Sequence, residues 1–250
     1  MLNFKLKLKN MRYVNLLLKS TLLLMFVAIL SPGSIFAQAH EDIEIKPTNG
    51  KKNTTIRKIA YYYPEFKSGR VVLLNGVATD TKLNYNLLSG EIEFINSSND
   101  TLALANLHTV ASIFIDADSF YYDNDSKELL KLLANYKDTK LLVKEKYEIA
   151  NIRSIGAMGI KSNSLPPTSS SEHDFKNQPT RLSKNESLTY SVKAEYYYQI
   201  NNRYLTATKS NTLKLFPEHR NELKDYIKTN NINFREVEDI KKLLVYTASL

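Results

Sequence analysis

Short apolar or aromatic runs, separated by turn-forming residues at a spacing of roughly ten residues, follow one another along the chain from Ile56 onward. Each run has room for one strand and is too short for a typical helix, so the pattern predicts an antiparallel β-meander. The expected strands of the first half span residues 56–64, 69–78, 83–88, 91–96, 101–105, 110–116 and 120–122. The expected strands of the second half span residues 141–150, 152–160, 188–199 and 204–208.

Turn-forming pairs mark the connections between these strands. Ser89-Gly90 separates two runs, and a glycine there can adopt the positive φ angle that a tight hairpin requires. Asn201-Asn202 separates two later runs in the same way. Gly156 and Gly159 interrupt a further run, where they predict a bulge or a bend.

Residues 128–136 fit two patterns at once. Leu129 begins a series of apolar residues at helical spacing, whereas every second residue from Leu130 is apolar, as in a strand. Asp125 stands three residues before Glu128, which is the spacing of a helix capping box. The residues of this segment leave helix and strand open.

The C-terminal part predicts two helices. Pro217 suits the first position of a helix that Asn230-Asn231 would end. Residues 234–247 carry a second apolar stripe, with Asn233 placed as the cap. We therefore expect a mainly β fold: a curled antiparallel meander, barrel-like or a sandwich, with two short C-terminal helices over residues 217–247.

Two polar stretches divide the chain. Residues 40–55 show no helical or strand periodicity, which predicts a flexible lead-in. Residues 161–187 are rich in serine and proline and hold few large apolar side chains, so we expect a disordered loop there. The remainder of 56–250 is expected to form a single β-rich domain, because its length suits one core.

Residues 1–39 have the three parts of a secretory signal peptide: a basic start, an apolar run over 21–30, and small residues at the end. The apolar run of about ten residues is half the length that a membrane span requires, so we expect no transmembrane helix in the mature chain. Cleavage after Ala37 and cleavage after Ala39 both satisfy the pattern of small residues. The expected location is the periplasm, the outer membrane or the medium.

The expected leader also explains most of the basic charge. It holds five of the 34 basic residues and none of the 26 acidic ones, so cleavage lowers the net charge from +8 to +3. A nucleic-acid partner is therefore not expected. The chain has no cysteine, which excludes a thioether-linked lipid anchor and thiol chemistry.

No catalytic motif stands out in the sequence. The four histidines lack metal-ligand neighbours at the required spacing, and the aspartates at 116, 118, 123 and 125 lack the glycine and glutamate of a calcium loop. Ser171, His173 and Asp174 have the residue types of a hydrolytic triad, but they stand side by side in the loop expected to be disordered. We expect no catalytic residue, no metal and no cofactor.

Two tyrosine triplets are the candidate binding residues. On a strand, each triplet places rings on both faces, which would suit an aromatic platform for a sugar, a peptide or a partner protein. The alternative is that tyrosine favours half-buried strand positions and keeps its hydroxyl near water. The candidates are Tyr61, Tyr62, Tyr63, Tyr196, Tyr197 and Tyr198.

Three segments carry a resemblance to a known group. They are Pro64-Glu65-Phe66 followed by Gly69, the stretch from Leu83-Asn84-Tyr85-Asn86 to Ile95, and Leu215-Phe216-Pro217. In these the chain resembles a group of uncharacterised exported, β-rich envelope proteins of Gram-negative bacteria. The resemblance implies export and a β-meander that continues through residues 128–136, and it implies no activity.

We expect an exported, non-enzymatic envelope protein that binds a protein or another cell-surface partner. One alternative is a carrier of a small molecule, a lipid or a glycan, in a cup-shaped sheet with an apolar cavity. A second alternative is a hydrolase in which carboxylates such as Glu91 and Asp116 meet across strands.

Overall fold

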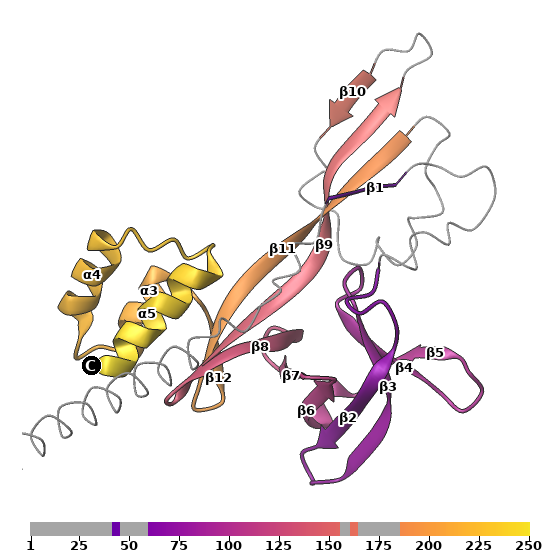
Figure 1. Cartoon of the computed structure of the whole chain (residues 1–250), viewed down its shortest axis with the longest axis horizontal. Coiled ribbons are helices and arrows are strands. Elements are labelled where there is room, and N and C mark those ends of the chain that lie inside the picture. The colour runs from indigo at the N-terminus through magenta and orange to yellow at the C-terminus, as the bar shows by residue number, and fades with distance from the viewer. Residues whose placement is uncertain (1–41, 46–59, 156–160, 165–185) are drawn as a thin grey trace, which may run out of the picture. The chain divides into compact units, whose positions relative to one another are not determined.

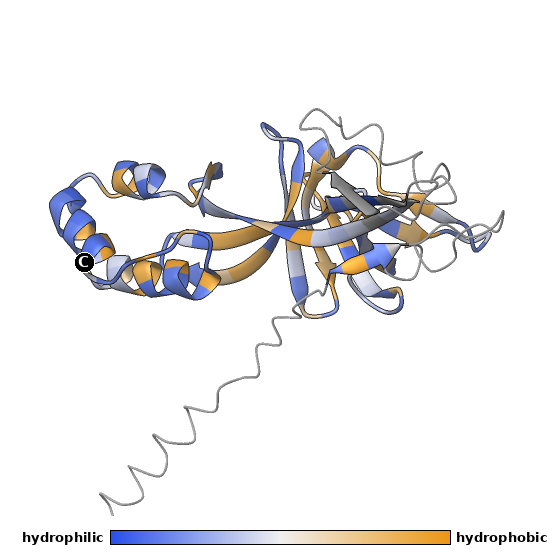
Figure 2. Cartoon of the chain, turned by 90° about the horizontal axis from the view of Figure 1, so that it is seen from above, coloured by the Kyte–Doolittle hydropathy of each residue, from blue (hydrophilic) through white to orange (hydrophobic). Residues whose placement is uncertain are grey.

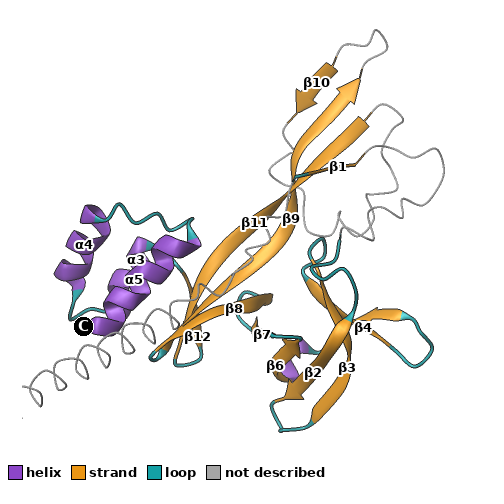
Figure 3. Cartoon of the chain, viewed as in Figure 1, coloured by secondary structure: helices purple, strands orange, loops and turns teal. Residues whose placement is uncertain are grey.

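The computed structural model describes residues 42–45, 60–155, 161–164 and 186–250. These residues form a 12-stranded antiparallel sheet followed by three C-terminal helices (Figures 1 and 3). The predicted mainly β fold is confirmed, and the sheet curls into a half-barrel, which is the barrel-like alternative. No helix among the described residues is long and apolar enough to cross a membrane.

The first seven strands are β1 (Ile43–Ile45), β2 (Lys67–Leu73), β3 (Ala78–Asn86), β4 (Glu91–Ile95), β5 (Thr101–Ala103), β6 (Val110–Ile115) and β7 (Asp118–Asp123), with a 3-10 turn η1 (Leu107–Thr109) before β6. The next five are β8 (Glu128–Tyr136), β9 (Thr139–Ile155), β10 (Lys161–Ser164), β11 (Glu186–Ile200) and β12 (Arg203–Thr206). The helices are α3 (Lys209–Leu215), α4 (Arg220–Thr229) and α5 (Val237–Ser249).

The strand order shows two meanders that start from β2. The order is β1-β11-β9-β8-β7-β6-β2-β3-β4-β5, with β10 added to β9 and β12 added to β11. From β2 the chain runs outward through β3, β4 and β5, then returns to the other side of β2 and continues through β6 to β9. β2 is therefore paired on both sides.

Two hydrogen bonds hold the curl of the sheet. The backbone N–H of Tyr147 on β9 donates to the carbonyl oxygen of Leu87, just after β3, at 2.8 Å. The hydroxyl of Tyr85 on β3 donates to the carbonyl oxygen of Glu145 on β9 at 2.9 Å. Because four strands separate β9 from β3 in the sheet order, these bonds require the sheet to bend back on itself.

Apolar side chains fill the inner face of this curl. In β2, β3, β4, β6 and β7 alternate residues point inward, so the faces of these strands combine into one core. Burial of this apolar surface is the main stabilising contribution to such a fold. The largest inward side chains with almost no exposure are Leu83, Leu87, Ile92, Ile113, Ile115 and Phe120.

The helices cover a different part of the sheet. Ile240 and Leu244 of α5 pack with Leu141 of β9 and Tyr198 of β11. Figure 2 shows that the helices carry hydrophobic residues on one side and hydrophilic residues on the other, as expected for helices that each bury one face. A smaller cluster joins the helices to one another, and it includes Leu213, Leu223, Ile227, Ile232 and Leu243.

Several predicted details are confirmed. Residues 128–136, whose own pattern left helix and strand open and which the resemblance favoured as strand, form strand β8, and the register of its pairing with β9 shifts between Leu132 and Ala134. Gly90 has a φ angle of +69° in the turn between β3 and β4. Asn201 and Asn202 both have positive φ angles and form the turn between β11 and β12.

Other strand predictions are wrong. Within the expected strand 56–64, the described residues form bends and a single bridge from Tyr61 to Asn86. The expected strand 69–78 is a hairpin, because Gly76 has a φ angle of +85° and its N–H donates to the carbonyl oxygen of Leu73 at 2.9 Å. A glycine inside an apolar run here marks a turn rather than a strand position.

The expected polar segments contain strands. Residues 43–45 of the expected lead-in 40–55 pair with β11, and residues 161–164 of the expected loop 161–187 pair with β9. Backbone pairing with a long neighbouring strand accounts for both, because it needs no apolar side chains. The expected leader 1–39, residues 40, 41 and 46–55 of the lead-in, Gly156 and Gly159, and residues 165–185 lie outside the described residues.

The C-terminal region has three helices rather than two. α3 was not expected, and the side chain of Thr208 caps it by accepting from the N–H of Asn211. α4 begins at Arg220 rather than Pro217. Asn233 does not cap α5, because Glu236 holds that position and the Asn233 side chain accepts from the N–H of Arg235 instead.

Candidate functional site

Tyr62 and Tyr63 of the first tyrosine triplet pack into the core on the inner face of the sheet, and the triplet lies outside the named strands. The hydroxyl of Tyr61 donates to Glu93 of β4 at 2.5 Å, and the hydroxyl of Tyr63 donates to Asp118 of β7 at 2.5 Å. Tyr62 packs edge-on against Tyr63, with ring centroids 4.9 Å apart. The two hydrogen bonds attach the triplet to two different strands, β4 and β7, so the triplet stabilises the curled shape of the sheet.

A buried ion pair stands beneath Tyr62. Lys131 of β8 is buried, and its Nζ lies 3.1 Å from a carboxylate oxygen of Glu145 on β9. The same ammonium donates to the hydroxyl of Tyr62 and lies 4.1 Å from the centre of its ring. The ammonium thus has a partner of opposite charge and a hydrogen-bond acceptor, as a buried charge requires.

The pKa values in this cluster move away from neutrality. Burial disfavours the charged form of Lys131, but Glu145 and Tyr62 outweigh burial and raise its pKa. Burial also raises the pKa of Tyr62 and of Tyr63, and Asp118 raises that of Tyr63 further. A general base that works at neutral pH needs a pKa near that pH, so these three groups suit structural support better than proton transfer.

The second triplet divides between the two faces of β11. Tyr198 is fully buried on the face that the helices cover, where its hydroxyl lies 3.1 Å from the hydroxyl of Thr212 and burial raises its pKa to about 12. Tyr196 packs into the same cluster. Tyr197 packs on the opposite face against Leu130 and Leu142.

The first triplet contacts β3, β4, β7 and β8, and the second contacts β8, β9, β12, α3 and α5, so β8 is shared between them. Their arrangement favours the alternative that tyrosines occupy half-buried positions. A binding role for any of the six tyrosines stays a prediction.

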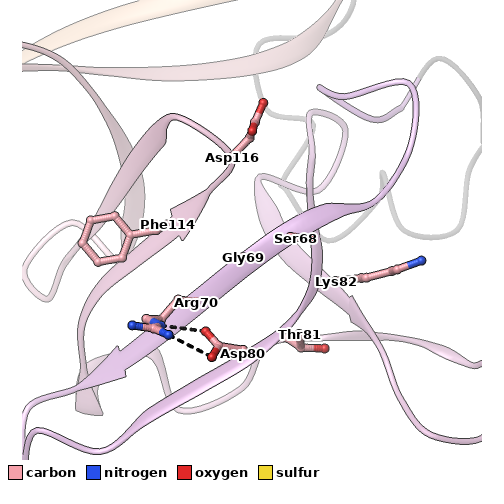
Figure 4. Close-up of a pocket in the computed structure, with 8 residues that line it drawn as sticks. All are labelled: Ser68, Gly69, Arg70, Asp80, Thr81, Lys82, Phe114 and Asp116. Atoms are coloured by element: carbon pink, nitrogen blue, oxygen red, sulfur yellow. Dashed lines mark hydrogen bonds and ion pairs between the residues drawn. The ribbon is translucent and has the colours of Figure 1, made fainter.

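A hollow opens on the outer face of the sheet where β2, β3 and β6 lie side by side (Figure 4). Its volume is about 520 Å³, within the range of small-molecule sites. The residues that line it are Ser68, Gly69, Arg70, Asp80, Thr81, Lys82, Phe114 and Asp116. We call this place the outer hollow.

The register of β2, β3 and β6 arranges the residues that line the outer hollow in two rows. Arg70 pairs with Asp80 on one side and with Phe114 on the other, which makes the first row. Ser68 pairs with Lys82, and its carbonyl oxygen accepts from the N–H of Asp116 at 3.1 Å, which makes the second row. Neighbouring strands are about 4.8 Å apart, so each row spans about 10 Å.

The two rows differ in which charges are free. Arg70 donates two hydrogen bonds to Asp80, at 2.6 and 2.9 Å, and these two charges neutralise each other. The side chains of Ser68, Lys82 and Asp116 make no hydrogen bond or ion pair with the described residues. Phe114 leaves its side chain 38% exposed beside them. The outer hollow therefore offers an unpaired cation, an unpaired anion, a hydroxyl and an apolar ring.

Gly69 lets these strands approach closely. A Cβ atom at this position would lie 2.6 Å from Cδ1 of Leu83 and 2.6 Å from the carbonyl oxygen of Phe114. The second contact is with backbone, which cannot move without shifting β6. The glycine thus leaves room for β2 to pair with β6 at this point, and that pairing places Phe114 next to Arg70.

The sequence reading missed both Lys131 and the outer hollow. A signal for Lys131 exists, because it is a lone charge inside Leu129-Leu130-Lys131-Leu132-Leu133 and so predicts a buried, paired lysine. No comparable signal exists for the outer hollow, since its residues come from three strands and only the register brings them together. Among the described residues, no three histidine or acidic side chains gather as metal ligands.

Comparison with known proteins gives no relative: no family model, no curated protein and no solved structure matches the chain. The resemblance to exported envelope proteins stays a prediction.

Proposed function

We propose that this chain is an exported, non-enzymatic protein of the cell envelope that binds a cell-surface partner through the outer hollow. Export is expected from the three-part leader in residues 1–39. The observation that carries the binding role is the set of unpaired polar groups beside an exposed phenylalanine ring in one hollow of about 520 Å³. Polar groups beside an apolar contact in one hollow are typical of ligand sites.

The tip of the β2–β3 hairpin supports a contact with a larger surface. Leu74 is 70% exposed and Val77 is 53% exposed, and both lie beside the turn at Gly76. Arg70 and Asp80 of the outer hollow belong to the same hairpin. A partner seated on the outer hollow therefore reaches apolar side chains at the tip without leaving this hairpin.

The inner face gives less support to a carrier of small apolar molecules. Its side chains pack against one another, and Leu83, Ile113 and Phe120 are almost wholly buried. A carrier needs an apolar cavity of roughly 300 Å³ or more, and this space is occupied by the protein's own core. The outer hollow, in contrast, is lined mainly by polar residues.

A sedimentation assay tests the proposal. The purified protein, as processed by the cell that makes it, is mixed with a washed envelope fraction, and the bound share is measured after centrifugation. We expect Lys82→Met combined with Asp116→Asn to lower the bound share about tenfold or more, since two charge-assisted contacts are removed. Val245→Ser is the control, because Val245 is an exposed apolar residue of α5.

The double variant binding as well as the natural protein would contradict the proposal. A loss of binding in the Val245→Ser control, with the double variant unaffected, would place the surface on α5. Both substituted positions of the double variant are exposed, so its circular dichroism spectrum should match that of the natural protein.

A further inference from the structure

We infer that the open edge of β5 pairs with β5 of a second copy of this chain, in an antiparallel contact that joins the two sheets. β5 is the last strand at its end of the sheet order, and Figure 1 shows it at the margin of the sheet, away from the helices. Residues 101–103 are exposed, and so is Ala105 just after them. The contact is separate from the proposed binding role, because the outer hollow contains none of these residues.

Half of the backbone groups of β5 face away from β4. The N–H of Leu104, just after β5, donates to the carbonyl oxygen of Ile92 on β4 at 2.8 Å. Since every second residue of an antiparallel strand bonds to the same neighbour, Thr101 and Ala103 point their N–H and C=O groups to the open side. These groups make no hydrogen bond with the described part of the chain. Unpaired backbone groups in a row are a template for a further strand.

Two rows of apolar side chains on the inner face end at this edge. In the first row, Leu83 of β3 faces Phe94 of β4, which in turn faces Leu102 of β5. The exposed fraction rises along this row from 0% at Leu83 to 46% at Leu102. The second row passes through Ile92 of β4 and ends at Leu104. A strand beside β5 that carries apolar side chains opposite Leu102 and Leu104 buries the ends of both rows.

β5 lacks the charges that protect the other open strands. β1, β10 and β12 each pair with a single neighbour within the described ranges, and they contain Glu44, Lys161 and Arg203, respectively. A charged residue on an edge strand opposes its pairing with another sheet. Residues 101–105 include no charged residue and no proline. β5 is therefore the least protected of these four open strands.

The edge is complementary to its own copy in one register. When the two Ala103 residues face each other, they exchange both of their free backbone hydrogen bonds, and Leu102 of each copy faces Leu104 of the other. The apolar rows of the two copies then continue into each other. The register that pairs Thr101 with Ala103 instead places Leu104 opposite the polar side chain of Asp100, so it buries less apolar surface. A second copy thus supplies the side chains that the edge requires.

The contact is small, which sets its strength. It uses about five residues of each copy, whereas a stable interface uses roughly 20 to 30 on each side. We therefore expect a weak dimer that forms at high protein concentration. Because both copies use the same edge, the contact closes after two copies and does not propagate into a fibre.

Single-cysteine variants of the processed protein test the contact, because the chain has no cysteine of its own. We expect Ala103→Cys to form a disulfide-linked dimer under mild oxidation, since the two Cα atoms lie about 5.5 Å apart across the contact. Ala105→Cys is the matched control, an exposed alanine two residues further along. In this register its two copies lie about 13 Å apart, beyond the roughly 7 Å that a disulfide spans, so its dimer should form about tenfold more slowly or less.

Sedimentation velocity of the cysteine-free protein shows whether the contact forms without a cross-link. The average sedimentation coefficient should rise between about 10 μM and 1 mM protein. Leu102→Lys should abolish this rise, because a charge replaces the apolar contact with Leu104 of the second copy. Val245→Lys should keep it, because Val245 is an exposed apolar residue of α5. Both positions are exposed, so both variants should keep the circular dichroism spectrum of the natural protein.

Three results would overturn the inference. One is an equal rate of disulfide formation for Ala103→Cys and Ala105→Cys. Another is a sedimentation coefficient that does not change with protein concentration. The third is a dimer that Leu102→Lys leaves intact and Val245→Lys disrupts, which would place the contact on α5. None of these measurements uses the envelope fraction, so their outcome is distinct from that of the proposed function.

Discussion

Two regions of the sheet bury their apolar side chains in different ways. One is the half-barrel formed by β2 to β8, and the other is the ribbon of β9 and β11 under the helices. The half-barrel buries its inner face by curling, and it encloses Lys131, Glu145, Tyr62 and Tyr63. The ribbon buries one face beneath α5, where the cluster is made of Leu141, Tyr198, Ile240 and Leu244 with few charges. Polar groups inside the half-barrel must therefore find specific partners.

This difference bears on where a ligand can bind. A curled sheet with a filled interior leaves its outer face as the accessible surface. The ribbon has its free face occupied by a ladder of ion pairs, in which Lys144 contacts Glu128 at 2.7 Å and Glu195 at 3.6 Å. Charges that are already paired on the ribbon contrast with the unpaired Lys82 and Asp116 in the outer hollow, which is why the proposed binding surface lies on the half-barrel.

High pH should unfold the half-barrel. The pKa values of Tyr62, Tyr63 and Tyr85 are raised by burial, and that of Lys131 is raised by Glu145 and Tyr62 against the opposing effect of burial. A group with a raised pKa in the folded state stabilises the fold fully below its unfolded pKa, and this stabilisation is lost as the pH rises. We expect the free energy of unfolding to fall steeply above pH 10, the ordinary value for tyrosine.

Tyrosinate absorbance and circular dichroism, recorded together from pH 9 upward, test this expectation. The phenols should ionise in the same cooperative step in which the β-sheet signal is lost. Ionisation of all tyrosines near pH 10, with the sheet signal unchanged, would contradict the buried positions of the first triplet.

Lys131→Ala should cost about 3 to 5 kcal/mol of the free energy of unfolding, because it leaves Glu145 as an unpaired charge in a mostly buried place. Urea denaturation measures the loss. The double variant Lys131→Met with Glu145→Leu should recover most of the stability, since an apolar pair of similar volume replaces the ion pair. If the single variant is as stable as the natural protein, the ion pair lies in water.

Leu244→Ala probes the ribbon and should cost about 2 to 5 kcal/mol, because Leu244 is fully buried between α5 and the sheet. Hydrogen exchange then sharpens the comparison. We expect faster exchange in α5 and around Tyr198, and little change in β2, β3 and β6, since packing defects act on their neighbours first. Equal acceleration in β2 and β3 would show that the two regions open together.

Gly69→Ala should cost about 1 to 3 kcal/mol, because the added Cβ would lie 2.6 Å from the backbone of Phe114 and force β6 to shift. The variant should also bind the envelope fraction less well, as Phe114 moves away from Arg70. Gly76→Ala is the comparison, since no atom lies within 4 Å of its Cβ but its φ angle of +85° strains any other residue. It should lower stability by backbone strain alone, with the pairing of Arg70 and Phe114 unchanged.

The local features were largely predictable from the sequence. Gly90 and the pair Asn201-Asn202 adopt positive φ angles, so turn residues could be assigned without tertiary information. Gly76 was missed because it stands inside an apolar run, from Val71 to Val77, that reads as one strand. That Gly76 forms a turn follows from the pairing of β2 with β3, and the local sequence pattern does not contain this pairing.

The candidate site depends on long-range pairing and was not predictable. Tyr62 meets Lys131 across 69 residues of sequence, and its ring position follows from the curl of the sheet. Alternation along a strand tells that Tyr197 faces away from Tyr198, but it does not tell which face is covered. In the outer hollow, Phe114 and Lys82 are brought together because β6 returns to the free side of β2.

Site-specific photo-cross-linking to the envelope fraction tests most directly the claim that the outer face of the half-barrel is the binding surface. A benzophenone side chain is placed at position 82 of the outer hollow or at position 245 of α5, both exposed. The account predicts adducts from position 82 that excess unlabelled protein removes, and none from position 245. Adducts from position 245 alone would contradict it.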